Sequence, residues 1–112
     1  MARIVRLTEH RPKRQPAPVF FDRNELNALL GLYSRHVAKG EWRDYAVGHD
    51  PGMARFSVFR HAHETPLFTI TKRLQGGKAL YAVHEGAKKV RQSGKLAEAL
   101  AVMNKPLRLV LG

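Results

Sequence analysis

The sequence LFTITKRLQGGKALYAVH, residues 67–84, is typical of a β-hairpin. Phe68 and Ile70 alternate with two threonines, which is the period of a strand with one buried face. The two glycines in residues 75–78 tolerate the positive φ angles that a tight hairpin turn requires. A second strand is expected over residues 80–84.

Strand patterns continue on both sides of this hairpin. Residues 55–60, RFSVFR, predict a strand before it, and residues 42–48 predict another. Asp-Pro-Gly at 50–52 supplies the turn between those two segments. The centre of the chain is therefore expected to be an antiparallel meander of about four strands, with residues 88–91 as a candidate for one more short strand.

A helix is expected on each side of the meander. Asp22 and Glu25 have the spacing of a capping box, so a helix is expected over residues 23–39, with Gly40 in the left-handed conformation after it. Its expected apolar stripe is Leu26, Leu29, Leu30, Tyr33 and Val37. The second helix starts after Ser93, and its expected buried face is Leu96, Ala99, Leu100 and Met103. The chain is therefore expected to be an α+β domain, with both helices on one face of the sheet.

Residues 1–18 differ from the rest of the chain. They hold five Arg or Lys residues and three prolines, which disfavour helix. No apolar segment of signal-peptide length interrupts them. We expect a flexible basic arm over 1–18, which orders on a partner, and a single α+β domain over 19–112.

Composition excludes several classes of protein. The 112 residues contain 20 Lys and Arg against 9 Asp and Glu, a formal net charge of +11, and no cysteine. Disulfide scaffolds and thiolate zinc sites are therefore excluded, and no apolar run is long enough for a transmembrane helix.

Catalytic motifs are equally scarce. The chain has no cysteine nucleophile, no Gly-x-Ser-x-Gly elbow and no phosphate-binding P-loop. His61 and His63 lie two residues apart, but a third metal ligand at diagnostic spacing is missing. We therefore expect no enzymatic activity, no cofactor and no metal site.

A cluster of positive charge is the strongest functional signal. Residues 72–95 hold seven basic residues against Glu85 alone. Such clusters neutralise phosphates and release counterions, which favours nucleic acid as the partner. Tyr81 and the strand from Phe56 to Phe59 are candidate stacking surfaces for bases. The candidate nucleic-acid-binding residues are Lys72, Arg73, Lys78, Lys88, Lys89, Arg91 and Lys95, together with Arg11, Lys13 and Arg14 of the arm.

The segment from Gly40 to Tyr45 supports an alternative. It holds the single tryptophan of the chain beside Arg43 and Tyr45, residue types that are frequent in interface hot spots. One interpretation is that Trp42 packs beneath the first helix. The other is that Trp42, Arg43 and Tyr45 form a protein-docking surface.

Several stretches resemble a small alphaproteobacterial family known as a domain of unknown function. They are residues 19–26, the stretch Gly-Glu-Trp-Arg-Asp-Tyr-Ala at 40–46, residues 56–60, Tyr-Ala-Val at 81–83 and Gly-Lys-Leu-Ala at 94–97. The resemblance covers roughly residues 19–110. It implies a bacterial cytoplasmic protein, and it carries no catalytic residue, cofactor or substrate.

Two functions follow as hypotheses, and a metal-dependent enzyme around His61 and His63 is a third and less favoured interpretation. The first is a non-enzymatic module that contacts nucleic acid through the basic cluster and the arm. The alternative is an accessory subunit of a larger assembly, docked through the Trp42 segment with the arm on an acidic protein surface. The sequence does not decide whether the nucleic-acid partner is RNA or DNA, and it does not decide the oligomeric state.

Overall fold

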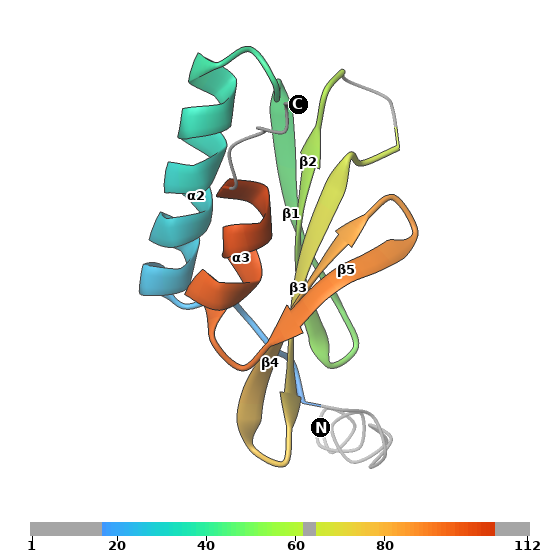
Figure 1. Cartoon of the computed structure of the whole chain (residues 1–112). Coiled ribbons are helices and arrows are strands. Elements are labelled where there is room, and N and C mark those ends of the chain that lie inside the picture. The colour runs from blue at the N-terminus through green and yellow to red at the C-terminus, as the bar shows by residue number, and fades with distance from the viewer. Residues whose placement is uncertain (1–16, 62–64, 105–112) are drawn as a thin grey trace, which may run out of the picture.

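The computed structural model describes residues 17–61 and 65–104. Within them a helix is followed by five strands and a second helix (Figure 1). The elements in chain order are α2 (Arg23–Ala38), β1 (Asp44–Asp50), β2 (Met53–Phe59), β3 (Phe68–Gln75), β4 (Lys78–Glu85), β5 (Lys88–Ser93) and α3 (Leu96–Asn104). The predicted α+β class is confirmed. Residues 107–111, LRLVL, also have a strand-like composition, but they lie outside the described residues.

The five strands form one antiparallel sheet in the order β1-β2-β3-β4-β5. The sheet has one strand more than the expected count of about four, because the short segment after Glu85 pairs along its length with β4. A register shift opposite Val83 and His84 places an extra residue in β5, so Val90 packs against the core.

Two glycines close the central hairpin as predicted. Gly76 and Gly77 have φ angles of 60° and 80°, and they connect strands that pair up to Gln75 and Lys78. Most side chains are strained at positive φ angles, so this turn favours glycine at both positions.

Helix α2 begins with the predicted capping box. The Glu25 N–H donates to the Asp22 side chain at 2.8 Å, and the Asp22 N–H donates to the Glu25 carboxylate at 2.8 Å. Gly40 follows the helix with a φ of 78°, as expected. The buried face of α2, however, is rotated about the helix axis relative to the expected apolar stripe. Leu32 and His36 are buried with Leu29, whereas Val37 is 40% exposed.

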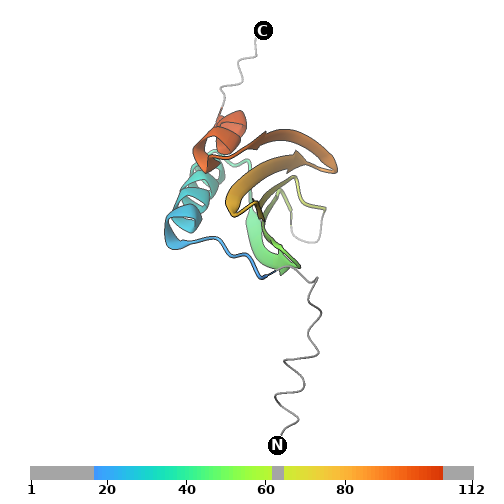
Figure 2. The ribbon, with the colours of Figure 1, turned by 90° about the horizontal axis from the view of Figure 1, so that it is seen from below.

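The core lies between the sheet and the two helices. Figure 2 shows both helices on one side of the sheet, as predicted. Leu29 and Leu32 of α2 and Leu100 of α3 belong to the same buried cluster as Phe56, Val58, Ile70 and Val83 of the strands. Val19 and Phe21, just before α2, complete this cluster. The described helices leave the opposite face of the sheet uncovered, and we call it the open face.

Candidate functional site: the open face of the sheet

Strand pairing identifies the side chains on the open face. Phe56, Ile70 and Val83 are paired neighbours in the core, so the residues that alternate with them point to the other side. On β2 to β5 these are Met53, Arg55, Ser57, Phe59, Thr69, Thr71, Arg73, Gln75, Lys78, Leu80, Ala82, His84, Lys89 and Gln92.

On β2 to β5 the charge of this surface is one-sided. Four residues there are Arg or Lys, and none is a carboxylate. The pairing of β1 with β2 places two carboxylates on the open face, Asp44 and Asp50, both on the edge strand β1. Arg55 is neutralised, because it forms an ion pair with Asp50 of β1. Arg73, Lys78 and Lys89 form no ion pair within residues 17–61 and 65–104. These three cations can therefore meet an external anion.

A small hollow lies between the cations. Its volume is about 50 Å³, and it is lined by Thr71, Arg73, Leu80, Ala82, His84, Lys89 and Gln92. Thr71 and Ala82 are only 5% and 7% exposed although no described helix covers them. The longer side chains around these two residues therefore shield the floor of the hollow.

His84 and Lys89 form one wall of this hollow. The two residues are paired between β4 and β5, and the Lys89 Nζ donates to the Gln92 Oε1 at 2.7 Å. Burial lowers the pKa of His84 below its ordinary value of 6.5, and the positive charges of Lys89 and Arg73 lower it further. The imidazole is therefore neutral at pH 7, and a bound anion would favour its protonation.

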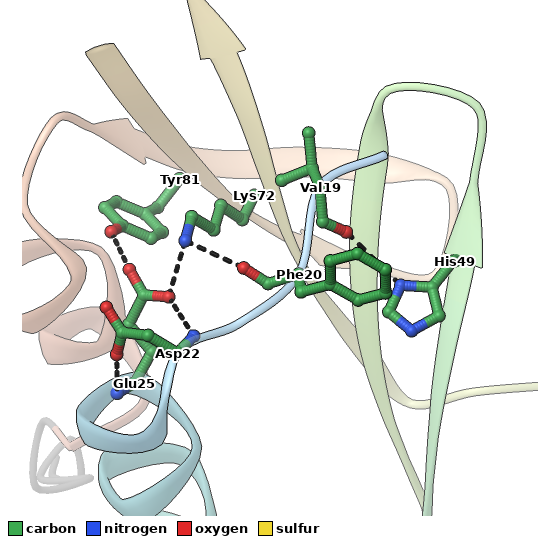
Figure 3. Close-up of polar contacts among 7 residues, drawn as sticks. All are labelled: Val19, Phe20, Asp22, Glu25, His49, Lys72 and Tyr81. Atoms are coloured by element: carbon green, nitrogen blue, oxygen red, sulfur yellow. Dashed lines mark hydrogen bonds and ion pairs between the residues drawn. The ribbon is translucent and has the colours of Figure 1, made fainter. Parts of the chain in front are cut away.

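Lys72 lies apart from the other predicted cations, on the helix side of the sheet. Its Nζ is 2.7 Å from Glu25 Oε1 and donates to the Phe20 carbonyl at 2.9 Å (Figure 3). The Lys72 and Glu25 side chains are 12% and 11% exposed, and the Tyr81 hydroxyl donates to the same carboxylate. Lys72 thus links the start of α2 to the sheet and is not available to a phosphate.

These contacts perturb two titrating groups. Burial acts to raise the pKa of Glu25, but the hydrogen bonds from Lys72, Tyr81 and the Asp22 backbone together hold it below its ordinary value of 4.5. Burial and the neighbouring Glu25 carboxylate raise the pKa of Tyr81 well above its ordinary value of 10. The network therefore contains an ionised Glu25 and a neutral Tyr81 at pH 7.

The remaining predicted cations lie away from the three cations of the open face that have no ion pair in the described residues. Lys88 lies exposed at the turn between β4 and β5, and Lys95 lies just before α3. The Arg91 guanidinium donates to the Glu98 carbonyl of α3 at 3.3 Å, on the helix side. Arg11, Lys13 and Arg14 lie outside the described residues. The structure thus brings together Arg73 and Lys89, with Lys78 farther along the same face.

The hypothesis that Trp42 belongs to a protein-docking surface needs a correction. Trp42 is 3% exposed and stacks on His36, with ring centroids 4.0 Å apart and an angle of 12° between the planes. It belongs to the core, so it cannot anchor a docking surface in the folded domain. Arg43 is exposed, and Tyr45 is 41% exposed although it contacts Tyr33 of α2.

We expect the fluorescence of Trp42 to report this burial. The isolated protein should emit at short wavelength, and iodide should quench it only weakly, because the ring is packed against His36 and Phe68. Unfolding in guanidinium chloride should shift the emission to longer wavelength and expose the ring to iodide. Strong iodide quenching of the folded protein would contradict the burial of Trp42 and show that its ring is accessible at the surface.

A larger cavity of about 470 Å³ lies where α2, α3 and the sheet meet. It is lined by charges of both signs, Lys39 and Arg60 with Glu41 and Glu85, beside Trp42 and Phe68. Mixed charge does not select anions, so this cavity is a weaker candidate for a polyanion than the open face.

The described part of the chain holds no candidate metal cluster and no helix that could span a membrane. Residues 17–61 and 65–104 contain no group of three potential metal ligands. His63 lies outside that part. Neither described helix is long and apolar enough to cross a membrane.

The fold and the open face define a small α+β domain whose uncovered sheet surface is basic. The chain belongs to the family described as protein of unknown function (DUF2794), whose model matches residues 19–100. The match covers the segment before α2, the whole sheet and the first half of α3. No curated protein and no solved structure shows significant similarity to the chain.

Proposed function

We propose that this protein is a non-enzymatic module that binds the phosphate backbone of nucleic acid on the open face of its sheet. The observation that carries the proposal is the one-sided charge of β2 to β5 on this face, because its two carboxylates, Asp44 and Asp50, both lie on β1. Arg73, Lys78 and Lys89 lie on it without a carboxylate on β2 to β5 to neutralise them. A net charge of +11 supports the same class of partner, because it attracts polyanions over long range.

The aromatic residues favour phosphate contacts over base stacking. Phe56 and Tyr81, two of the stacking candidates, are 1% and 7% exposed and lie on the helix side of the sheet. Phe59 is half-buried at the end of β2. Sequence-specific recognition of single strands relies on exposed aromatic platforms. We therefore infer that binding depends weakly on base sequence.

Salt dependence tests this proposal. If Arg73, Lys78 and Lys89 each neutralise one phosphate, the logarithm of the association constant should fall against the logarithm of salt with a slope of about −2.7, or more steeply if the arm contributes. Fluorescence anisotropy of a labelled mixed-sequence duplex measures this slope between 50 and 200 mM salt. Binding that is absent at the lowest salt, or insensitive to salt, would reject the proposal.

An accessory-subunit role is the second candidate function. The observation that favours it is the exposed apolar surface of the edge strand β1. This edge strand carries exposed Tyr45 and Val47, at 41% and 46%, and Phe20 beside it is 59% exposed. It holds no Lys, Arg or Pro, residues that commonly protect edge strands from pairing. A pull-down from the host with and without nuclease separates the two roles. Protein partners that survive nuclease and high salt would favour the subunit, and partners lost with nuclease would favour nucleic acid.

A further inference from the structure

We propose that the hollow between β3, β4 and β5 is a seat for one backbone phosphate, held by Arg73 and Lys89 and sensed by His84. The inference rests on the proposed function and assigns a specific place to one of its phosphate contacts. Its basis is the shape of the hollow, the identity of its lining residues and their place on three paired strands.

The size of the hollow fits a single small group. Its volume of about 50 Å³ exceeds what one water molecule needs, about 10–15 Å³. It is far below the volume of roughly 300–1,000 Å³ typical of pockets for drug-sized ligands. A tetrahedral oxyanion fits such a space, whereas a nucleoside does not.

The lining supplies what an oxyanion requires. Arg73 enters from β3 and Lys89 from β5, on opposite sides of the floor formed by Thr71 and Ala82. The Thr71 hydroxyl and the Gln92 amide add neutral hydrogen-bonding groups. No carboxylate lines the hollow, so a bound anion would meet no like charge.

His84 gives this seat a measurable property. The charged groups that act on its imidazole are Lys89 from β5 and Arg73 from β3, and α2 and α3 lie on the other face of the sheet. Both neighbours are positive and disfavour the imidazolium form. A bound anion would offset them and stabilise that form. Anion affinity should therefore rise as the pH falls through the pKa of His84.

NMR titration of the histidines in the full chain tests the seat, with sulfate as the first probe because its charge stays constant between pH 5 and 8. Sodium sulfate should raise the pKa of His84 by about 0.5–1 compared with sodium chloride of equal ionic strength. His49 is an internal control, because its ring contacts Phe20 and the Val19 carbonyl away from the hollow. Equal shifts of His49 and His84 would overturn the proposal.

Matched variants locate the effect. Lys89→Gln and Arg73→Gln should each reduce the sulfate-induced shift of His84 at least about twofold, since each removes one of two cations that hold the anion. Lys78→Gln removes a cation from the same face but outside the hollow, and should leave the shift unchanged. A shift that persists in both lining variants would overturn the proposal.

A short DNA duplex is the second probe, and it separates this inference from the proposed function. A His84 shift with both probes supports the phosphate seat. Duplex binding without a His84 shift would overturn the seat and leave the proposed function intact. A shift with sulfate alone, without duplex binding, would show a site for small oxyanions and reject both the nucleic-acid function and a seat for a backbone phosphate.

Discussion

Replacing Lys72 by alanine should lower the free energy of unfolding by about 3–5 kcal/mol. The substitution leaves the Glu25 carboxylate buried with Tyr81 and the Asp22 N–H as its remaining partners. It also removes the donor to the Phe20 carbonyl, so the segment before α2 loses a link to the sheet. Urea unfolding followed by Trp42 fluorescence measures the change, because Trp42 is buried in the fold.

Two comparisons make this result specific. Lys78→Ala removes a lysine from an exposed position and should change stability by no more than about 0.5 kcal/mol. The double variant Glu25→Gln with Lys72→Met removes both charges together, and it should recover part of the loss of Lys72→Ala. A loss below about 1 kcal/mol in Lys72→Ala would mean that water replaces the ammonium group around Glu25.

The difference in the free energy of unfolding between the wild type and Lys72→Ala should also depend on pH. In the wild type the pKa of Glu25 lies below its ordinary value of 4.5, so the ionised carboxylate contributes stability that is lost as the pH falls below 4.5. Without Lys72, burial acts against the ionised form and the pKa of Glu25 rises. The difference in stability between wild type and variant should therefore narrow at acid pH.

Reversing charge on the open face should have the largest effect on binding. Each phosphate contact releases about 0.9 counterion, which contributes about tenfold in affinity at 50 mM salt. The double variant Arg73→Glu with Lys89→Glu should thus weaken binding to a mixed-sequence duplex on the order of 100-fold. Both residues are exposed and lie outside the core, so the fold should be retained. Fluorescence anisotropy gives the affinities, and circular dichroism checks the fold.

Much of the fold could be predicted from local signals. The capping box at Asp22 and Glu25, the glycines of the central turn and the period of two in the strands depend on neighbouring residues alone, and all are present in the structure. The rotation of α2 could not be predicted in this way. Leu32 and Val37 are both apolar, and only packing against the sheet buries the first and exposes the second.

The candidate site could be predicted only in part. Lys72 has the same parity in β3 as Phe68 and Ile70, so the alternation already indicated that it points toward the core. A count of basic residues does not separate Lys72 from Arg73, although Arg73 lies on the same side of the strand as Thr69 and Thr71. The side of the sheet that Lys89 occupies depends on the register shift opposite His84. A pattern of period two cannot anticipate such a bulge.

The proposed stacking surface and the Trp42 surface share one cause of error. Phe56, Tyr81 and Trp42 were candidates because aromatic side chains are frequent in binding sites, but aromatic side chains also contribute most to small cores. All three are buried, with exposed fractions of 1%, 7% and 3%. In a domain of this size few other large side chains can fill the space between the sheet and two helices.

The proposed function requires that the open face, and not positive charge in general, binds nucleic acid. The most direct test measures duplex affinity for the wild type, for Arg73→Glu with Lys89→Glu, and for a control that reverses two exposed cations of α2, Arg23→Glu with Arg35→Glu. The two double variants change the net charge equally. We expect a loss on the order of 100-fold for the open-face pair and a much smaller loss for the α2 pair. Equal losses would contradict it, because net charge alone would then explain the binding.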